Sequence, residues 1–401
     1  MIMKDFRKRG LVPLVLFIAV FALNLILRRY YFLQKEYFGL YLDTPDYWNE
    51  LWSGPHPLIT LSRDFISQFY RFAWAGPLIT ALVTTGLFLL LRLFLKRYQI
   101  LLAAVWLAGW VIVLLSPQNR ERERWAKVEY ASLHRQWEKV VAAIPPEAAE
   151  KDRVLIPYAL LACSELGTLP QNIFRYPVTG PEDIDLEGEL TRHGYFFTSL
   201  VNESLGCTNE AIHNTFQAAC TTPHGTSHGT LRQLIKFNLA SGNKAMALKY
   251  CDILEKSPLN AATARAARKY AEALPDESFL DRGASDTALV ITHDTGRNLR
   301  LLARAGFFNA AAADRYRCLL LLQRDLDAFV ASLPPEKDFA TLPLAYQQAL
   351  CLVSDPDIRR RLPAATAEAF RRYMEVYNLI PMRGPGPVQP GTYWEYYFQG
   401  N

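Results

Sequence analysis

The sequence predicts an all-α protein with an apolar N-terminal part and a helical C-terminal part, and two patterns support this. Residues 1–119 contain three long apolar runs, whereas residues 120–401 show helical apolar spacing with short breaks. Strand-like alternation is scarce, and Ala288 to Thr292 is the best short candidate. Half of the 401 residues are hydrophobic, which excludes a disordered chain.

The three apolar runs predict three transmembrane helices: Leu11–Leu27, Phe72–Leu91 and Tyr98–Pro117. About 20 apolar residues cross the ~30 Å hydrocarbon core, where a helix satisfies its own backbone. The first run could instead be a secretory signal peptide. However, Arg28-Arg29-Tyr30-Tyr31 follows it where a small-residue cleavage site would stand, so we expect an uncleaved anchor.

The basic residues predict the orientation of these helices. One group precedes the first run and a second separates the other two runs: Lys4, Arg7, Lys8 and Arg9, then Arg92, Lys96 and Arg97. The positive-inside rule places both groups in the cytoplasm and, with three spans, the C-terminal part outside it. Five arginines on the other side count against this orientation: Arg28, Arg29, Arg120, Arg122 and Arg124. We expect a multi-pass protein of a bacterial inner membrane with a periplasmic C-terminal domain.

Residues 28–71 form the loop between the first two runs and are rich in aromatic residues from Tyr30 to Trp52. Such rings favour the membrane–water boundary. Five apolar residues then recur at spacings of three and four, on one helix face: Leu58, Leu61, Phe65, Phe69 and Phe72. This pattern predicts an interfacial helix in contact with membrane lipids. It could be a lipid-sensing or partner-docking surface, but we expect an anchor that leads into the second span.

The same loop carries three acidic residues, Asp43, Asp46 and Glu50, which are the candidate catalytic residues of the chain. Acids in a first external loop can act as bases in membrane glycosyltransferases that use lipid-linked sugars. Such enzymes need many more spans to build a cavity. A solvated turn around Pro45 is therefore the expected structure, because Asp and Pro are ordinary turn residues.

Helical hairpins dominate residues 120–275. Leu234 to Pro258 has Gly242 between two helices and a closing proline, and this layout resembles a tetratricopeptide unit. Leu200 to Pro223 repeats it with Gly206, which lies 36 residues before Gly242, close to the usual ~34-residue period. Weaker matches stand at 133–145, 158–167 and 301–308. We therefore expect a degenerate tetratricopeptide-like α-hairpin solenoid, a shape that usually binds peptides or protein partners.

The remaining sequence predicts a less regular helical region at 276–381 and a Gly- and Pro-rich tail at 382–401. The tail ends in five aromatic residues between Tyr393 and Phe398, which we expect to dock on the domain or on a partner. All six cysteines lie in the second part, mostly in apolar helical stretches where a free, buried thiol is the commoner state.

His224 and His228 are the candidate metal ligands, since two histidines four residues apart can chelate a metal on a helix. The segment from Thr222 to Thr230 reads instead as a turn between repeats, and no HExxH pattern follows, so we expect no metal. Nucleotide-binding glycine motifs are also missing, and we expect no cofactor. The net charge of +5 is too mild to indicate a nucleic-acid partner.

Several segments together resemble a family of uncharacterised integral membrane proteins of Bacteroidota-type bacteria. They are Leu61–Pro77 (LSRDFISQFYRFAWAGP), Tyr158–Phe174, Gly206–Phe216, Leu344–Leu352 (LAYQQALCL) and Thr392–Phe398 (TYWEYYF). The resemblance implies a membrane-embedded N-terminal part and a tetratricopeptide-like C-terminal part. It implies no catalytic residues.

The functional expectation is a membrane-anchored helical-repeat scaffold or adaptor that binds another envelope protein, without enzymatic activity of its own. The alternative is an enzyme, or a subunit of one, that acts on a lipid-linked substrate at the membrane surface. That alternative requires a polar cleft near Asp43, Asp46 and Glu50.

Overall fold

The computed structural model of the chain describes residues 2–95, 98–184, 191–274, 295–306, 309–334, 338–379 and 389–399. Within them every regular element is a helix, so the predicted all-α class is confirmed. The candidate strand at 288–292, the basic residues Lys96 and Arg97 and most of the Gly- and Pro-rich tail lie outside these residues. The chain forms two compact units, each built from two segments: 1–134 with 215–278, and 135–214 with 279–401.

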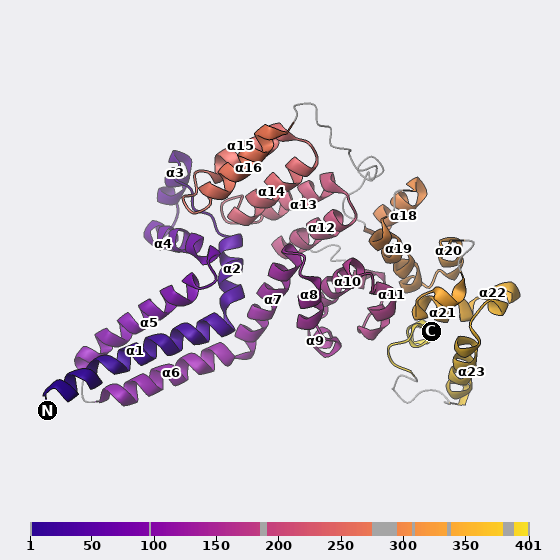
Figure 1. Cartoon of the computed structure of the whole chain (residues 1–401), viewed down its shortest axis with the longest axis horizontal. Helices are drawn as coiled ribbons and strands as arrows, with labels where there is room; N and C mark the ends of the chain where they lie inside the picture. The colour runs from indigo at the N-terminus through magenta and orange to yellow at the C-terminus, as the bar shows by residue number, and fades with distance from the viewer. Residues whose placement is uncertain are drawn as a thin grey trace. The chain divides into compact units, whose positions relative to one another are not determined.

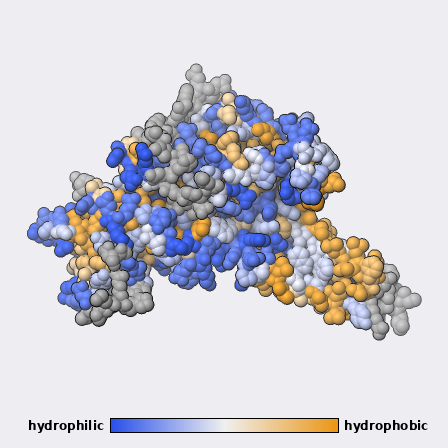
Figure 2. Space-filling view, turned by 180° about the vertical axis from the view of Figure 1, so that it is seen from behind, coloured by the Kyte–Doolittle hydropathy of each residue, from blue (hydrophilic) through white to orange (hydrophobic). Residues whose placement is uncertain are grey.

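The first unit begins with an apolar three-helix bundle. Helices α1 (Ile2–Leu27), α5 (Ala75–Phe94) and α6 (Gln99–Leu115) lie side by side (Figure 1). Four side chains are buried between them: Leu16, Val20, Ala81 and Phe88. The outer surface of the bundle is apolar as well, as the orange residues of Figure 2 show. Large exposed side chains there include Leu14, Ile18, Val83, Leu90 and Ile112.

One of the three helices, α5, is by itself long and apolar enough to cross a membrane. The other two meet that criterion only together with the next helix, and each pair is bent at the break between its two helices. The chain turns by 68° between Leu27 and Arg29, where α2 (Arg29–Tyr37) begins, and by 56° before Pro117, where α7 (Pro117–Leu133) begins. Proline at the start of α7 has no N–H to continue the ladder of α6, which accounts for the second bend. The described residues therefore contain one to three candidate spans.

The loop between α1 and α5 is itself helical. It consists of α2, α3 (Pro45–Ser53), α4 (Pro57–Ser67) and the short 3₁₀ helix η1 (Gln68–Arg71). Thr44 caps α3, because its hydroxyl accepts a hydrogen bond from the Tyr47 N–H at 3.3 Å, and Pro45 occupies the first helical position. The helix expected from the Leu58 to Phe72 spacing is α4, followed by η1.

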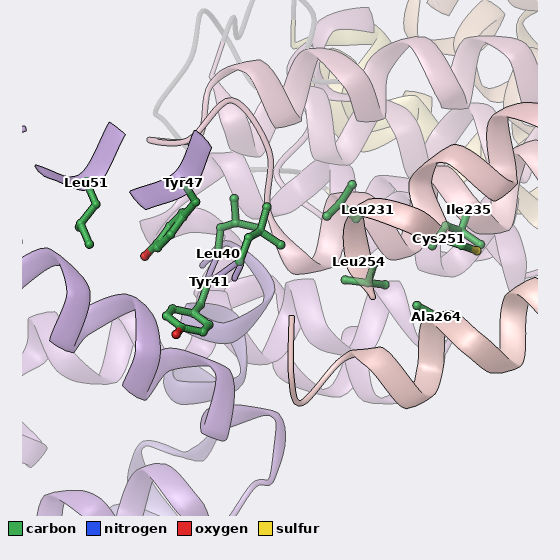
Figure 3. Packing of buried hydrophobic residues seen from close by; sticks show 10 residues of the cluster. Leu40, Tyr41, Tyr47, Leu51, Leu231, Ile235, Cys251, Leu254 and Ala264 are labelled. Atoms are coloured by element: carbon green, nitrogen blue, oxygen red, sulfur yellow. The ribbon is translucent and has the colours of Figure 1, made fainter. Parts of the chain in front are cut away.

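Three further helices complete the first unit: α14 (His228–Ala240), α15 (Lys244–Leu254) and α16 (Ala261–Ala273). Each packs against the next, and all three contact the preceding loop through a buried apolar cluster (Figure 3). Leu40, Tyr41, Tyr47 and Leu51 enter the cluster from the loop. The helices contribute Leu231, Ile235, Cys251, Leu254 and Ala264. The aromatic-rich loop thus shares a core with helices almost 200 residues later.

The turns between successive helices repeat one geometry. Gly167, Gly206 and Gly242 all have a positive φ of 66–76°, which glycine adopts without steric cost. In each turn an N–H that follows the glycine donates to a carbonyl five residues earlier, for example Asn243 to Asn238 at 2.8 Å. This is the Schellman arrangement, which satisfies carbonyls at a helix end. The helix pairs predicted around Gly206 and Gly242 are present: α12 (Arg192–Ser204) with α13 (Thr208–Cys220), and α14 with α15.

The second unit surrounds α10 (Ile156–Glu165), in which every residue from Ile156 to Ser164 is buried. Its neighbours include α8 (Trp137–Ala143), α11 (Leu169–Asn172), α12 and α19 (Ala310–Leu322). The other elements of this unit are α9 (Pro146–Lys151), η3 (Arg153–Leu155), η4 (Ile173–Arg175), η5 (Pro181–Ile184), α18 (Thr295–Ala305), α20 (Leu326–Ala331), η6 (Phe339–Thr341), α21 (Leu344–Leu352), α22 (Pro356–Arg360), α23 (Ala364–Leu379) and α24 (Tyr393–Phe398).

The aromatic end of the chain docks on the second unit rather than standing free. Trp394 is buried, and its indole N–H donates to the backbone oxygen of Gln348 in α21 at 2.8 Å. The Tyr396 hydroxyl donates to the Leu322 backbone oxygen at 2.6 Å. Of the two alternatives that the sequence left open for these aromatics, the structure shows docking on the domain.

Candidate functional site

Two polar clusters lie where the loop between α1 and α5 meets α14 to α16, and we call this region the loop–helix junction (residues 36–71 with 222–263). Several of its polar side chains are buried within one compact unit, among them Glu36, Asp64, His228, Ser257 and Asn260. Backbone contacts also cross it: the His228 N–H donates to the Gly39 oxygen at 2.9 Å, and the Asp43 N–H donates to the Lys256 oxygen at 2.9 Å. The junction therefore places groups from distant parts of the chain next to each other.

The inner cluster is built around Glu36 of α2. Both carboxylate oxygens accept hydrogen bonds from the Arg232 guanidinium, at 2.7 and 2.8 Å, and this bidentate geometry is the strongest form of such a pair. Arg232 also donates to the Asn260 side-chain oxygen at 2.8 Å. Burial by itself would raise the pKa of Glu36, but the Arg232 charge and hydrogen bonds outweigh it and hold that pKa below its ordinary value. Glu36 is thus a buried carboxylate.

His228 lies beside this pair with no exposed surface. Its Nε2 accepts the backbone N–H of Tyr41 at 3.1 Å and faces the Ser257 hydroxyl at 3.1 Å. Because Nε2 accepts, the ring proton belongs on Nδ1, which is 3.7 Å from a Glu36 oxygen. Burial lowers the pKa of His228, which favours this neutral ring.

Ser257, His228 and Glu36 therefore stand in the order of a hydrolase triad, yet the geometry does not suit catalysis. Ser257 and His228 have no exposed surface, so a substrate carbonyl cannot reach the Ser257 oxygen. The acceptor nitrogen that would take the serine proton is already occupied by the Tyr41 N–H. We therefore interpret the inner cluster as a structural connection between α2 and α14.

The outer cluster is built around His224, which belongs to the turn between α13 and α14 and contacts both α3 and α4. Its Nδ1 is 3.1 Å from a Glu50 oxygen and its Nε2 is 3.0 Å from an Asp64 oxygen. Asp64 also accepts hydrogen bonds from the Tyr47 hydroxyl at 3.0 Å and from Arg63 at 2.9 Å. The hydrogen bond to Asp64 raises the pKa of His224. Burial would raise the pKa of Asp64, but His224 and Arg63 outweigh it and lower that pKa.

These two clusters include only some of the residues singled out from the sequence. Asp43 is exposed and accepts the Trp48 indole N–H at 3.1 Å, and Asp46 is exposed in the first turn of α3. Of the three candidate acids, only Glu50 joins a cluster, through His224. Glu36 and Asp64 are not among the predicted site residues, and their partners Arg232 and His224 lie too far along the chain for a local pattern to reveal them.

His224 and His228 contact different carboxylates and do not converge on one point. Glu50 and Asp64 bind opposite ring nitrogens of His224, so their oxygens are held apart by the ring. Within the described part of the chain, no group of three His, Cys, Asp or Glu side chains is suited to hold a metal ion.

A family model described as a family of unknown function (DUF6057) matches residues 6–118 and 98–400. The chain belongs to this family. The match confirms the predicted resemblance to a family of unknown function that covers the chain, whereas the bacterial group, the membrane part and the repeats implied by it stay predictions. No curated protein and no solved structure shows significant similarity to the chain.

A further polar contact in this DUF6057 chain links the two helices that follow the bends. The Glu123 carboxylate of α7 accepts the backbone N–H groups of Tyr30 and Tyr31, at 3.0 and 2.9 Å, and so caps the start of α2. Burial raises the pKa of Glu123 to about 7 in spite of these donors.

Arg71 adds a third connection to the junction, donating to the Leu259 oxygen at 2.9 Å and to the Thr263 hydroxyl at 2.7 Å.

Proposed function

We propose that this chain is a membrane-anchored helical scaffold that binds another envelope protein. In this proposal α1, α5 and α6 cross a bacterial inner membrane, and the remaining helices lie in the periplasm. The large exposed apolar side chains around the bundle support the membrane anchor, because a soluble protein rarely leaves such a surface uncovered. The basic residues in the first turns of α1, at the end of α5 and directly after α5 support the orientation.

The observation that carries the scaffold function is the loop–helix junction. Buried ion pairs and a shared apolar core fix α14, α15 and α16 to the loop that joins the first two apolar helices. Helices attached in this way keep one orientation relative to the membrane, which a flexible linker would not provide. The repeated glycine turns support the further proposal that the helix pairs form a tetratricopeptide-like solenoid.

Three exposed apolar side chains on these helices are candidates for contact with the partner: Phe216 of α13, Ile253 of α15 and Tyr270 of α16. Single exposed apolar residues are ordinary on protein surfaces. Their weight here comes from their position on helices of the kind that usually bind partners.

Affinity purification from native membranes in mild detergent, with quantitative mass spectrometry, tests the proposal. We expect a partner at near-equal abundance that is lost from the Phe216→Ala/Tyr270→Ala double variant. The matched control Glu272→Ala changes an exposed polar residue of α16 and should retain the partner. Recovery of the chain without any stoichiometric protein would contradict the scaffold function.

The alternative function, an enzyme acting on a lipid-linked substrate, stays a prediction. It requires Asp43, Asp46 or Glu50 to contact that substrate. A glycolipid that co-purifies with the wild-type chain and is lost from the Asp46→Asn variant would favour it over the scaffold.

A further inference from the structure

Helix α4 has its polarity reversed. Leu58, Ile59 and Phe65 point outward and are 66%, 69% and 43% exposed, whereas Asp64 and Ser67 are buried. A helix on the surface of a soluble protein shows the opposite arrangement, with apolar residues toward the core and charges toward water. Something other than water is therefore expected on the outer face of α4.

Specific contacts hold α4 in this orientation. Asp64 is fixed from the inside by the Tyr47 hydroxyl and the His224 ring, and Leu61 packs against the buried cluster of Figure 3. Rotation of α4 to bury Leu58 and Phe65 would turn Asp64 away from its partners and break its hydrogen bonds to Tyr47 and His224. The apolar outer face is thus a stable feature of the junction.

The polar group in the middle of this face is satisfied within the helix. Ser62 lies between Leu58 and Phe65 along the chain, is exposed, and donates its hydroxyl hydrogen to the Leu58 backbone oxygen at 2.7 Å. A hydroxyl bonded in this way needs no water partner, as in helices that face lipid.

The outer face of α4 continues toward the first residues of α5. Phe72 and Trp74 are 44% and 53% exposed, and their rings stack with centroids 5.9 Å apart, directly before α5 begins. Aromatic residues at the start of an apolar helix are typical of the membrane–water interface. The Arg63 side chain is 59% exposed, within reach of lipid phosphates if α4 lies at that level.

We propose that Leu58, Ile59, Phe65, Phe72 and Trp74, here called the α4 face, contact lipid in the headgroup and upper acyl-chain region of the leaflet where α5 begins. This inference rests on the proposed membrane anchor. It commits to lipid rather than to a second copy of the chain because the face runs into a helix that is itself proposed to cross the bilayer. The α4 face differs from the apolar face that the sequence predicts. Leu61 points inward, whereas Ile59 and Trp74 point outward.

Site-directed labelling of the full chain in phospholipid vesicles tests the proposal. Of the six cysteines only Cys220 is exposed, so a Cys220→Ser background leaves buried thiols that label poorly. An environment-sensitive fluorophore is then attached at Ile59→Cys or Phe65→Cys. Val83→Cys, on the exposed side of α5, is the positive control, and Ala266→Cys, exposed on α16, is the aqueous control.

Brominated phospholipids then report the depth of each label. We expect labels at positions 59 and 65 to lose more emission with bromine near the glycerol backbone than with bromine near the chain ends. The label at position 83 should show the reverse order, and the label at position 266 should lose none.

Each other outcome overturns a different statement. Quenching at position 83 without quenching at 59 and 65 would overturn the lipid contact of the α4 face while leaving the membrane anchor intact. Labels at positions 59 and 65 that are shielded from water, and that lie close to the same label on another chain, would indicate a second copy on this face. Absence of quenching at all four positions would overturn the membrane anchor itself.

Discussion

Two buried carboxylates at the loop–helix junction are stabilised by different kinds of cation. Glu36 is paired with Arg232, which stays charged at all accessible pH values. Asp64 is paired with His224, whose charge depends on pH in the physiological range. The stability that the inner cluster contributes should therefore change on substitution. The stability that the outer cluster contributes should change both on substitution and with pH.

Replacement of Arg232 by methionine should strongly destabilise the first unit. The substitution leaves Glu36 buried without its bidentate partner, and breaking such a pair costs about 3–5 kcal/mol of the free energy of unfolding. The double variant Glu36→Gln/Arg232→Met should recover part of this loss, because no unpaired charge remains. Thermal unfolding in mild detergent measures both effects. Equal midpoints for the single variant and the wild type would show that the pair contributes nothing.

The outer cluster should make stability depend on pH. The raised pKa of His224 means that its contribution is complete below its ordinary pKa of 6.5 and is lost as the pH rises through the raised pKa. The lowered pKa of Asp64 means that its contribution is present above its ordinary pKa of 3.8 and is lost as the pH falls below that value. The stability difference between the wild type and His224→Gln should thus be largest between pH 3.8 and 6.5. A difference that grows from pH 6.5 to 9 would contradict this assignment.

Sequence reasoning could find one side of each contact but not the pair. The spacing of His224 and His228 drew attention to both histidines, yet their carboxylate partners, Asp64 and Glu36, lie 160 residues or more away in the chain. Local patterns contain no information about contacts of that range. The same limit explains why Glu50 was noted as an acid in a loop and not as a partner of His224.

At the scale of the helix pairs, replacing a turn glycine by a residue that avoids positive φ should lower the stability of the pair. Gly242 has a φ of 74°, and Gly242→Ala should lower the free energy of unfolding by about 1–2 kcal/mol, the cost of the left-handed region. Gly242→Asn is the matched control and should cost less, because asparagine enters this region more readily. Equal destabilisation by both variants would show that the loss has another origin.

The contact between α2 and α5 predicts a second glycine effect. A Cβ atom at Gly76 would lie only 2.8 Å from the Cβ of Phe32, so Gly76→Ala should cost about 1–3 kcal/mol through overpacking. Gly86 lies in the same helix with nothing near the position of its Cβ. Gly86→Ala should therefore be neutral or slightly stabilising, since alanine favours helix. Thermal unfolding of the two variants in the same detergent compares them directly.

Helices and turns could be predicted from the sequence better than their faces could. The segment around Gly242 predicted two helices with a glycine turn, and α14 and α15 occupy it. The periodicity around Leu58 predicted a helix but grouped Leu61 with the outward residues. Periodicity gives the angle between side chains and not the direction of the core, and here the buried direction is set by Tyr47 and His224 from other elements.

At the scale of the whole molecule, each compact unit is formed from two separate segments of the chain. A chain that ends at residue 214 would contain the loop between α1 and α5 without α14, α15 and α16. Leu40, Tyr41 and Leu51 would then lose the helices that cover them. Limited proteolysis with mass spectrometry should detect cleavage between residues 38 and 53 in this truncated chain and protection in the full one. Protection in both would show that the loop folds without its later partners.

The separation of these segments also means that the two sides of the junction are synthesised at different times. Asp64 leaves the ribosome 160 residues before His224, and at about 5–20 residues per second this interval lasts roughly 8 to 30 seconds. During that interval the inward face of α4 has a carboxylate without its histidine, and the aromatic residues beside it have no core. The nascent chain therefore passes through a stage in which the loop is made but lacks the helices that cover it in the folded first unit.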